Sequence, residues 1–435
     1  MAETRKPSSL RLDPWHDRYA RRAGGMVASE VRALFAVASR PEIVSLAGGM
    51  PNVAALPMDL VAETMSGLVT DRGAVALQYG SAQGDPGLRE RICQVMAWEG
   101  IAAHPEHVVV TVGSQQALDL LARIFLDPGD VVVTEGPTYV TAINTFAAYE
   151  ATVVHVGMDD HGLITEALEE TLARLAAAGR TVKFLYTVPT FQNPAGVTLD
   201  LPRRERLLEI CRRNGLLVVE DNPYGLLGFD GDPIRALRAD APDDVVYLGS
   251  FSKTFAPGLR VGWALAPPGI RDKLVLAAEA AMLSHSMFAQ LAIDRYLTTQ
   301  PWPEQLKMFR EMYHERRDAM LEALAEHMPP GATWTRPAGG FFVWLRLPDG
   351  VDTKAMLPRA ISERVAYVPG TGFYADGNGH TAMRLSYCFP PPERIRDGVA
   401  RLAGVIAAEL DLRAVFGPVS PSGPPGPDLA EPTGA

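Results

Sequence analysis

The sequence predicts an α/β fold, in which a large domain with a mainly parallel, doubly wound sheet is followed by a smaller α+β domain. From about residue 70, short β-branched runs alternate with segments whose apolar residues recur at helical spacing, which is typical of strands joined by crossover helices. Near residue 303 this alternation gives way to one long charged helix and several short strands. Of the 435 residues 47% are hydrophobic, which suffices for a core of this size.

The alternating part defines the expected sheet. The expected strands are 107–113, 131–136, 151–157, 182–188, 216–221 and 244–250. The expected helices are 114–126, 139–149, 163–179 and 201–215, with a DPGD turn at 127–130 after the first of them. Short apolar strands that alternate with helices favour parallel pairing, and ligands of such sheets bind at the carboxyl ends of the strands.

The remaining segments complete the expected organisation. A short helix is expected at 28–40, long helices at 304–328 and 393–410, and short strands within 339–347, 365–370 and 382–389. The expected divisions are an N-terminal arm and helix at 1–54, which joins the small domain, a large domain at 55–302, a small domain at 303–416 and a disordered Pro- and Gly-rich tail at 417–435.

Composition excludes several classes of protein. The formal net charge of −10 argues against broad binding to nucleic acid or to an anionic membrane surface. No apolar run approaches the roughly 20 residues of a membrane span, and no secretory signal is visible, so cytoplasm is the expected location. Cys93, Cys211 and Cys388 lie far apart without metal-ligand spacing, which predicts buried thiols in a reducing compartment and no metal site.

The ends of the first two expected strands carry candidate binding groups. Ser114 and Gln115 open a helix directly after a strand, where free N–H groups and the helix dipole favour a phosphate. Ser114 as a simple N-cap is the alternative. Tyr139, after the next strand, would stack on a flat ring or simply pack.

Two later strand ends carry an amide and carboxylates. Asn193 precedes a proline in a turn-forming stretch and either forms a plain turn or presents its amide to a ligand oxygen. Asp221 and Tyr224 follow the strand at 216–221, and a carboxylate placed there needs a partner such as a protonated ring nitrogen. Glu220 is expected to point to the opposite side of that strand.

The stretch GSFSKTFAPGLRVGW places Lys253 directly after a strand. Burial and nearby cations lower the pKa of a lysine and make it a nucleophile for carbonyl chemistry, whereas most lysines are solvated surface charges. Ser250, Ser252 and Arg260 offer the hydroxyls and the planar fork that suit a phosphate. A cofactor with an aldehyde, a basic ring nitrogen and a phosphate fits these groups, and pyridoxal 5′-phosphate (PLP) has all three.

In this order the motifs resemble those of the fold-type-I PLP-dependent aminotransferases of class I/II. The resemblance covers roughly residues 25–415 and is strongest to the group containing 2-aminoadipate and kynurenine aminotransferases. It is carried by SLAGGMPN, LQYGSAQG, GSQQALDL, NPAG, EDNPY, SFSKTFAPGLRVGW and MRLSY.

The resemblance implies a role for each cofactor residue. Lys253 resembles the lysine that forms the Schiff base with PLP, and Asp221 resembles the acid that pairs with the pyridinium nitrogen. Asn193 and Tyr224 resemble the residues that hydrogen-bond the phenolic oxygen of the ring, and Tyr139 resembles the aromatic residue that stacks on it.

The resemblance also implies a phosphate site and a substrate site. The residues that look like the phosphate cup are Ser114, Gln115, Ser250, Ser252 and Arg260. Tyr79 resembles a tyrosine that reaches the phosphate of the neighbouring subunit, which implies a homodimer. Arg384 resembles the arginine that binds the substrate α-carboxylate, with Gly49 and Asn193 lining the substrate site. The resemblance further implies that 1–54 acts as a substrate lid and that 55–302 is the PLP-binding domain. Arg32, within 1–54, matches an arginine that can meet a distal carboxylate, or it is a surface cation.

The function implied by the resemblance is transfer of an amino group from an L-amino acid to a 2-oxo acid, with Lys253 as the Schiff-base residue, ping-pong kinetics and 2-oxoglutarate as the expected acceptor. The donor is 2-aminoadipate, an aromatic or a branched-chain amino acid. Three alternatives are a PLP lyase or decarboxylase on the same fold, the aminotransferase-like domain of a DNA-binding regulator, and a non-enzymatic carbohydrate- or peptide-binding scaffold. Only about forty residues precede SLAGGMPN, too few for a winged-helix module, and the retained lysine disfavours a scaffold.

Overall fold

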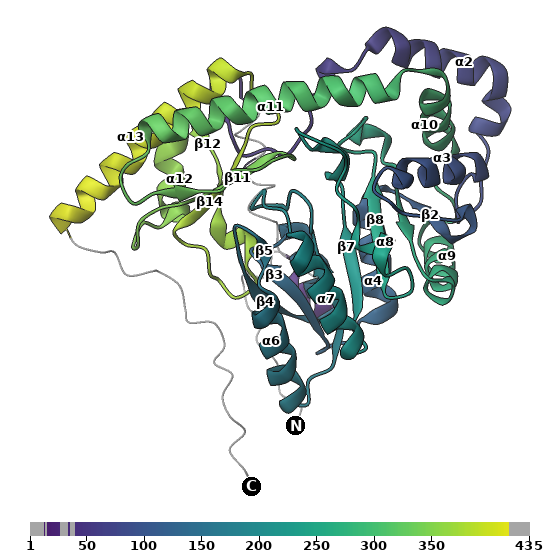
Figure 1. Cartoon of the computed structure of the whole chain (residues 1–435), viewed down its shortest axis with the longest axis horizontal. Helices are drawn as coiled ribbons and strands as arrows, with labels where there is room; N and C mark the ends of the chain where they lie inside the picture. Colours follow the sequence, from purple (N-terminus) through teal and green to yellow (C-terminus); the bar gives the residue numbers. More distant parts are fainter. Residues whose placement is uncertain (1–12, 14, 27–33, 35–39, 417–435) are drawn as a thin grey trace, which may run out of the picture.

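The computed structural model describes residues 13, 15–26, 34 and 40–416. Its largest sheet has eight strands in the spatial order β2-β9-β8-β7-β6-β3-β4-β5. These strands are β2 (Val108–Thr111), β9 (Gly262–Leu265), β8 (Val245–Ser250), β7 (Leu217–Asp221), β6 (Val182–Thr187), β3 (Val131–Gly136), β4 (Thr152–Asp159) and β5 (Gly162–Leu163). The mainly parallel α/β fold expected from the sequence is confirmed (Figure 1).

The direction of the strands brings the predicted site segments to one edge of this sheet. The pairings from β8 through β7, β6 and β3 to β4 are parallel. Strand β9 is antiparallel to both of its neighbours, so β2 runs in the same direction as β8. The carboxyl ends of β2, β3, β6, β7 and β8 therefore lie at the same edge, where ligands of such sheets bind.

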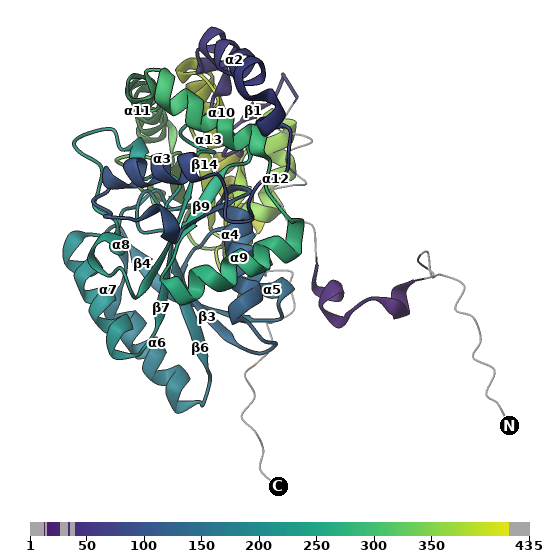
Figure 2. The ribbon, with the colours of Figure 1, turned by 90° about the vertical axis from the view of Figure 1, so that its right-hand side faces the viewer.

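Helices cover both faces of the sheet, as Figure 2 shows. One face carries α4 (Gly113–Phe125), α5 (Val140–Ala148) and α9 (Pro268–Met282), and the other carries α6 (Thr165–Ala177), α7 (Leu201–Arg213) and α8 (Leu237–Asp240). Each face has its own buried cluster: Val, Leu, Ala, Phe and Tyr side chains on the first face, and mainly Val and Leu side chains on the second. The strands of the centre are buried on both faces, which is why their sequences are continuous apolar runs.

Six of the described helices were not predicted from the sequence. Besides α8 and α9, these are α2 (Met58–Ala76), α3 (Pro86–Ala97), α10 (Met287–Thr299) and α12 (Thr353–Ser362). Helix α2 packs on α10 through a small cluster that includes Leu68 and Leu291. Because Val69 and Val75 of α2 are exposed, its apolar residues do not form the single stripe by which a helix is recognised in a sequence.

The C-terminal part forms a second, antiparallel sheet with three helices. Its strands are β10 (Thr333–Trp334), β11 (Phe342–Arg346), β14 (Ala382–Ser386) and β13 (Val368–Pro369), in that spatial order. Its helices are α11 (Trp302–His327), α12 (Thr353–Ser362) and α13 (Pro392–Phe416), and α11 lies along α13 (Figure 1). The predicted domain boundary at 302/303 falls at the start of α11, and the division itself remains a prediction.

A short parallel pair connects the N-terminal part to this second sheet. Strand β1 (Val44–Ser45) pairs with β12 (Val365–Ala366), and the chain then runs on through residues 46–50 beside β14. The expected helix at 28–40 lies outside the described residues except for Leu34 and residue 40, and the expected tail at 417–435 lies outside them entirely. Within the described part of the chain, none of the helices has the length and apolar character that crossing a bilayer requires.

Candidate active site

A cavity of about 320 Å³ opens at the carboxyl edge of the large sheet. The predicted site residues that line it are Gly49, Ser114, Gln115, Tyr139, Asn193, Asp221, Tyr224, Ser250, Ser252, Lys253, Arg260 and Arg384. The structure therefore brings together residues that are up to 335 positions apart (49 to 384). Tyr79 does not line the cavity and is 77% exposed, and Arg32 lies outside the described residues.

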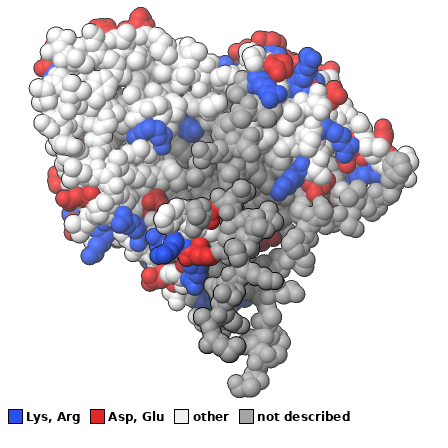
Figure 3. Space-filling model, turned by 180° about the vertical axis from the view of Figure 1, so that it is seen from behind, with Lys and Arg blue, Asp and Glu red and all other residues white. Residues whose placement is uncertain are grey.

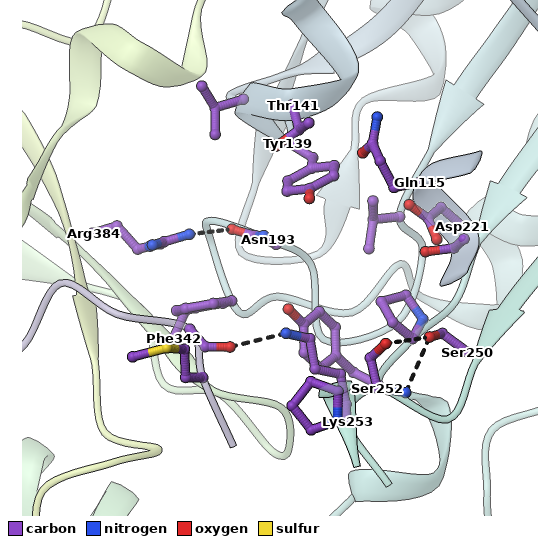
Figure 4. Close-up of a pocket in the computed structure, with 18 of the residues that line it drawn as sticks. Gln115, Tyr139, Thr141, Asn193, Asp221, Ser250, Ser252, Lys253, Phe342 and Arg384 are labelled. Carbon is purple, nitrogen blue, oxygen red and sulfur yellow. Dashed lines mark hydrogen bonds between the residues drawn. The ribbon is translucent and has the colours of Figure 1, made fainter. Parts of the chain in front are cut away.

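Lys253 lies just beyond β8, with its side chain inside the cavity (Figure 4). Burial is the main reason why the pKa of Lys253 is lowered to about 8; the nearby cations Arg384 and Arg260 act in the same direction, and Cys388 and Asp221 oppose the shift. Its Nζ donates to the carbonyl oxygen of Gly49 at 2.9 Å. A lysine with this pKa has an appreciable neutral fraction near neutral pH, which a nucleophile or a general base requires.

Asp221 is the last residue of β7 and is 5% exposed. Its Oδ2 accepts a hydrogen bond from the hydroxyl of Tyr186 at 2.8 Å, whereas its Oδ1 has no hydrogen-bond partner among the described residues. Burial raises the pKa of Asp221 to about 6, and the Tyr186 hydroxyl and Lys253 oppose that rise. An unpartnered buried carboxylate oxygen is costly unless a ligand supplies a donor.

Glu220 points away from the cavity, as expected from the alternation of side chains along a strand. Its carboxylate accepts hydrogen bonds from the backbone N–H groups of Leu237 and Arg238 at 3.0 and 2.9 Å. Of the two adjacent acids, Asp221 alone is therefore available to a ligand in the cavity.

A polar cradle lies where α4 begins. Arg260 donates from Nη1 to Ser252 Oγ at 3.2 Å, and Ser250 Oγ donates to Ser252 Oγ at 2.9 Å. Gly113 has φ +73°, and a Cβ at this position would lie 2.5 Å from Arg260 Nη2. Glycine is strongly favoured here, because the positive φ strains any other residue and the guanidinium would have to move to make room for a Cβ.

The interpretation of Ser114 as a simple N-cap is wrong. The N-cap of α4 is Val112, without a side-chain cap, and the Val112 N–H instead donates to Gln116 Oε1 at 2.7 Å. Ser114 is thus inside the first turn, facing the cavity. The early N–H groups of α4 point toward the same place, which makes the cradle suitable for a phosphate.

The side chain of Gln115 is committed elsewhere. Its Nε2 donates to Thr145 Oγ1 at 2.8 Å, and Thr145 Oγ1 in turn donates to the Thr141 carbonyl oxygen, so the direction of the amide is fixed. Its Oε1 has no partner. We expect Gln115 to contribute to anion binding through its backbone N–H rather than through its amide group.

Arg384, on β14, faces Asp221 from the other side of the cavity (Figure 4). Its Nη1 donates to Asn193 Oδ1 at 2.9 Å and its Nη2 to the Ala47 carbonyl oxygen at 2.8 Å. The guanidinium carbon lies 4.2 Å from the centre of the Phe342 ring, and Nε has no partner. Burial lowers the pKa of Arg384 to about 10, so the side chain remains a cation at neutral pH.

Residues 46–50, here called the carbonyl segment, connect β14 to Lys253. Each of its five carbonyl oxygens faces a donor. The Leu46 carbonyl accepts from Ser386 N, the Ala47 carbonyl from Arg384 Nη2 and the Gly49 carbonyl from Lys253 Nζ. The Gly48 and Met50 carbonyls both lie within reach of the single S–H proton of Cys388. A Cβ on Gly49 would lie 2.8 Å from the Phe342 ring.

Cys388 and Cys211 are buried as expected, but Cys93 is only partly buried, and all three are free.

Two tyrosines border the space between Asp221 and Arg384. Figure 4 shows the Tyr139 ring on one side of this space and the Lys253 side chain on the other. Tyr224 is 3% exposed, and its ring contacts Phe341 and Phe342 edge-on at 5.3 and 6.0 Å between centres. Tyr186, Phe342 and Met50 were not predicted, because nothing in the sequence separates them from ordinary core residues.

The residues present fit PLP. The unpartnered Oδ1 of Asp221 suits the protonated ring nitrogen, the cradle at Gly113 suits the phosphate, and the buried Lys253 suits the aldehyde. No cluster of three or more His, Cys, Asp or Glu side chains that could hold a metal occurs among the described residues.

Comparison with known proteins gives the same assignment. The family model described as "Aminotransferase class I and II" matches residues 46–402. An aromatic-amino-acid aminotransferase of Thermococcus litoralis is 42% identical over 90% of this chain and 94% of its own length. A 2-aminoadipate transaminase of Thermus thermophilus is 39% identical over 92% of this chain and 98% of its own length.

A solved structure of similar shape is the kynurenine aminotransferase of Pyrococcus horikoshii in complex with PMP. It is 43% identical, with a TM-score of 0.86, and the match covers 91% of this chain and 98% of the other. Fold, cofactor fit and sequence similarity agree. The chain therefore belongs to the class I and II aminotransferase family and is a PLP-dependent aminotransferase of fold type I that acts on amino acids and 2-oxo acids.

Proposed function

We propose that this aminotransferase moves the amino group of an L-amino acid to 2-oxoglutarate with ping-pong kinetics. The observation that carries the proposal is that Lys253, Asp221 and Arg384 meet in one cavity, with Asp221 and Arg384 on opposite sides (Figure 4). Such a site can hold the ring of the cofactor at one end and the carboxylate of the substrate at the other.

Each residue then has a defined task. Bound PLP supplies the carbon that receives the amino group and a ring that draws electrons from the substrate Cα. Lys253 Nζ removes the proton from Cα, which its lowered pKa favours. Arg384 binds the α-carboxylate and orients the Cα–H bond toward Lys253. The buried Asp221 keeps the ring nitrogen protonated, so that charge developing in the transition state is stabilised.

The tyrosines and the cradle hold the cofactor in place. We assign the phosphate to the α4 N-terminus with Ser114, Gln115, Ser250, Ser252 and Arg260, the ring face to Tyr139, and the phenolic oxygen to Asn193 and Tyr224. The Asn193 amide serves both the substrate and the cofactor: its Oδ1 accepts from Arg384, and its Nδ2, which is bonded to no other described residue, faces the ring. Gly49 borders the substrate, since its loop lines the cavity beside Phe342.

The walls favour a large donor side chain. Among the described residues that line the cavity, the cations are Lys253, Arg260 and Arg384, each already assigned. The wall beyond them includes Met50 and Phe342, which suit an aromatic or branched-chain donor. A distal carboxylate, as in 2-oxoglutarate or 2-aminoadipate, needs a further cation, and we assign that task to Arg32. The names of the relatives, which include aromatic-amino-acid and 2-aminoadipate aminotransferases, support the same set of donors.

We also propose a homodimer with active sites at the subunit interface. Leu77 and Tyr79 are each 77% exposed. Leu283, which is 56% exposed, lies on a neighbouring loop, and the Gly80 N–H donates a hydrogen bond to Ser284 Oγ of that loop. Figure 3 shows, from behind, a broad face with few charged side chains on the side that carries α2, α9 and α10. In this dimer Tyr79 reaches the phosphate of the partner.

The free cysteines are consistent with a cytoplasmic location, which we also propose.

A panel of amino donors tests the proposed function. The purified holoenzyme is mixed with aromatic, branched-chain and acidic L-amino acids, each with 2-oxoglutarate or pyruvate, while the cofactor spectrum and the new amino acid are followed. We expect 2-oxoglutarate to be the better acceptor and double-reciprocal plots at several acceptor concentrations to be parallel. Intersecting plots would reject the ping-pong order. Release of CO₂ or ammonia without a new amino acid would support the lyase or decarboxylase alternative instead. Gel filtration with light scattering tests the dimer.

A further inference from the structure

The only polar protein group within hydrogen-bond distance of the Asp221 carboxylate, among the described residues, is the hydroxyl of Tyr186. Tyr186 lies on β6, is fully buried and does not line the cavity. Its register explains the contact: Tyr186 pairs with Val219 of β7, and Asp221 lies two residues further along on the same face. The Tyr186 hydroxyl thus reaches Asp221 Oδ2, at 2.8 Å, from behind the carboxylate.

We propose that Tyr186 is a positioning residue that acts through Asp221. It fixes the carboxylate so that Oδ1 is the oxygen presented to the protonated ring nitrogen of PLP, and it stabilises the ionised form. The proposal rests on the role of Asp221 stated under the proposed function.

The chemistry of the hydroxyl supports both effects. Tyr186 has one proton to donate, and that proton is committed to Oδ2. A carboxylate held at one oxygen cannot rotate freely, so the other oxygen, which has no protein partner, stays directed at the cavity. A hydrogen bond to the charged form of an acid also favours that form, which opposes the rise in the pKa of Asp221 that burial causes.

Few other groups near Asp221 could replace the Tyr186 hydroxyl as a hydrogen-bond donor to its carboxylate. The titratable groups that interact with Asp221 are Lys253, Tyr139, Tyr186, Tyr224 and Tyr247. Lys253 donates to the Gly49 carbonyl, and the hydroxyl of Tyr247 donates to Glu99 at 2.6 Å. The Tyr186 ring itself is held by Phe146, with 5.7 Å between ring centres, so removal of the hydroxyl alone should leave the packing in place.

Tyr247→Phe is a matched control for Tyr186→Phe. Tyr247 is also a buried tyrosine on a central strand, 1% exposed, with its hydroxyl on a buried carboxylate, but that carboxylate is Glu99 rather than Asp221. Tyr186→Phe and Tyr247→Phe therefore each remove one buried hydrogen bond from a tyrosine hydroxyl to a carboxyl group, although burial raises the pKa of Glu99, to about 8, more than that of Asp221. Only the first removes it from the acid that faces the cavity.

Affinity for PLP is the first readout, and it needs neither the donor nor the acceptor. Apoenzyme is titrated with PLP by protein fluorescence, and melting temperatures are measured alongside. We expect Tyr186→Phe to raise the Kd for PLP about tenfold, the effect of losing one hydrogen bond to a charged group. We expect Tyr247→Phe to lower the melting temperature with a Kd within twofold of wild type. An unchanged Kd in Tyr186→Phe, or an equal rise in both variants, would overturn the proposal.

Two further measurements separate a positioning role from general damage. In an Asp221→Asn background, Tyr186→Phe should no longer change the Kd for PLP, because its effect passes through the carboxylate. In the otherwise wild-type enzyme, Tyr186→Phe raises the pKa of Asp221, so the acid limb of the kcat profile should move to higher pH while KM for the amino acid changes little. Persistence of the full effect in the Asp221→Asn background would reject the assignment. If the wild-type enzyme itself did not catalyse transamination, the proposed function would be rejected instead.

Discussion

Replacing Arg384 by lysine tests how the substrate carboxylate is held. The guanidinium has five N–H groups, and two nitrogens already donate to Asn193 Oδ1 and the Ala47 carbonyl oxygen. Its Nε–H and the second hydrogens of Nη1 and Nη2 remain for the two oxygens of a carboxylate. A lysine has three N–H groups, and if two of them stay on the same protein acceptors only one is left for the substrate.

Arg384→Lys should therefore remove about one charge-assisted hydrogen bond, worth about 1.5–3 kcal/mol. At about 1.4 kcal/mol per factor of ten, kcat/KM should fall roughly 10- to 150-fold. The loss should be similar in both half-reactions, because the amino acid and the 2-oxo acid both carry the α-carboxylate. The stacking on the Phe342 ring, at 4.2 Å, is weakened as well, which adds to the effect rather than opposing it.

The assay is stopped-flow measurement of each half-reaction under single-turnover conditions, with the affinity for PLP as an internal check. Arg346→Lys is a matched control, because Arg346 lies on the neighbouring strand β11 and is exposed outside the cavity. We expect that control to behave as wild type. A loss below threefold, or a loss confined to one half-reaction, would show that Arg384 does not bind the shared carboxylate.

Three other substitutions test the rest of the site. Lys253→Met should abolish transamination in a coupled assay. It should also make the apoenzyme more stable than wild type near pH 7, because burying the Lys253 ammonium destabilises the folded wild type, as the lowered pKa shows. This difference in stability should shrink as pH rises from about 8 toward 10.5 and the ammonium loses its proton, which melting curves across that range would measure. A pH-independent difference would contradict this. Arg260→Lys should raise the Kd for PLP about tenfold in a fluorescence titration and leave KM for the amino acid unchanged at saturating PLP, since the fork is lost from the phosphate and not from the substrate. Gly113→Ala should lower the free energy of unfolding, measured with denaturant, by about 1–3 kcal/mol and should weaken PLP binding. The reason is that φ is +73° and that the new Cβ would lie 2.5 Å from Arg260 Nη2. A variant of normal stability would show that Arg260 can move aside.

The sequence predicted the sheet and the cavity residues for a common reason. Strands in the centre of a parallel sheet are continuous apolar runs, and polar residues directly after such runs must gather at one edge. Asn193, Asp221 and Lys253 were identifiable in this way, each from its own short stretch. The antiparallel strand β9 was not assigned, because its four residues give no periodicity and its direction depends on pairing with β2 and β8.

The unpredicted parts depend on contacts between distant segments. Tyr186 has the sequence context of a core residue, and its contact with Asp221, 35 positions away, depends on the register of β6 and β7. Cys388 meets residues 48 and 50, about 340 positions earlier, through its thiol. Pattern-based interpretation covers a window of some ten residues, so such partners become visible only once the chain is folded.

The carbonyl segment has a consequence for how this chain can change in length. Its five consecutive carbonyls face donors on four residues, Lys253, Arg384, Ser386 and Cys388, and Cys388 faces two of them. Insertion or deletion of one residue within 46–50 would shift every later carbonyl by one place and would present Lys253 with a different residue. A change in its length would therefore disturb several of these contacts at once, and Gly49 in addition has no room for a side chain against Phe342. A graft of this substrate loop into another scaffold would have to carry residues 46–50 and 384–388 together, as one unit.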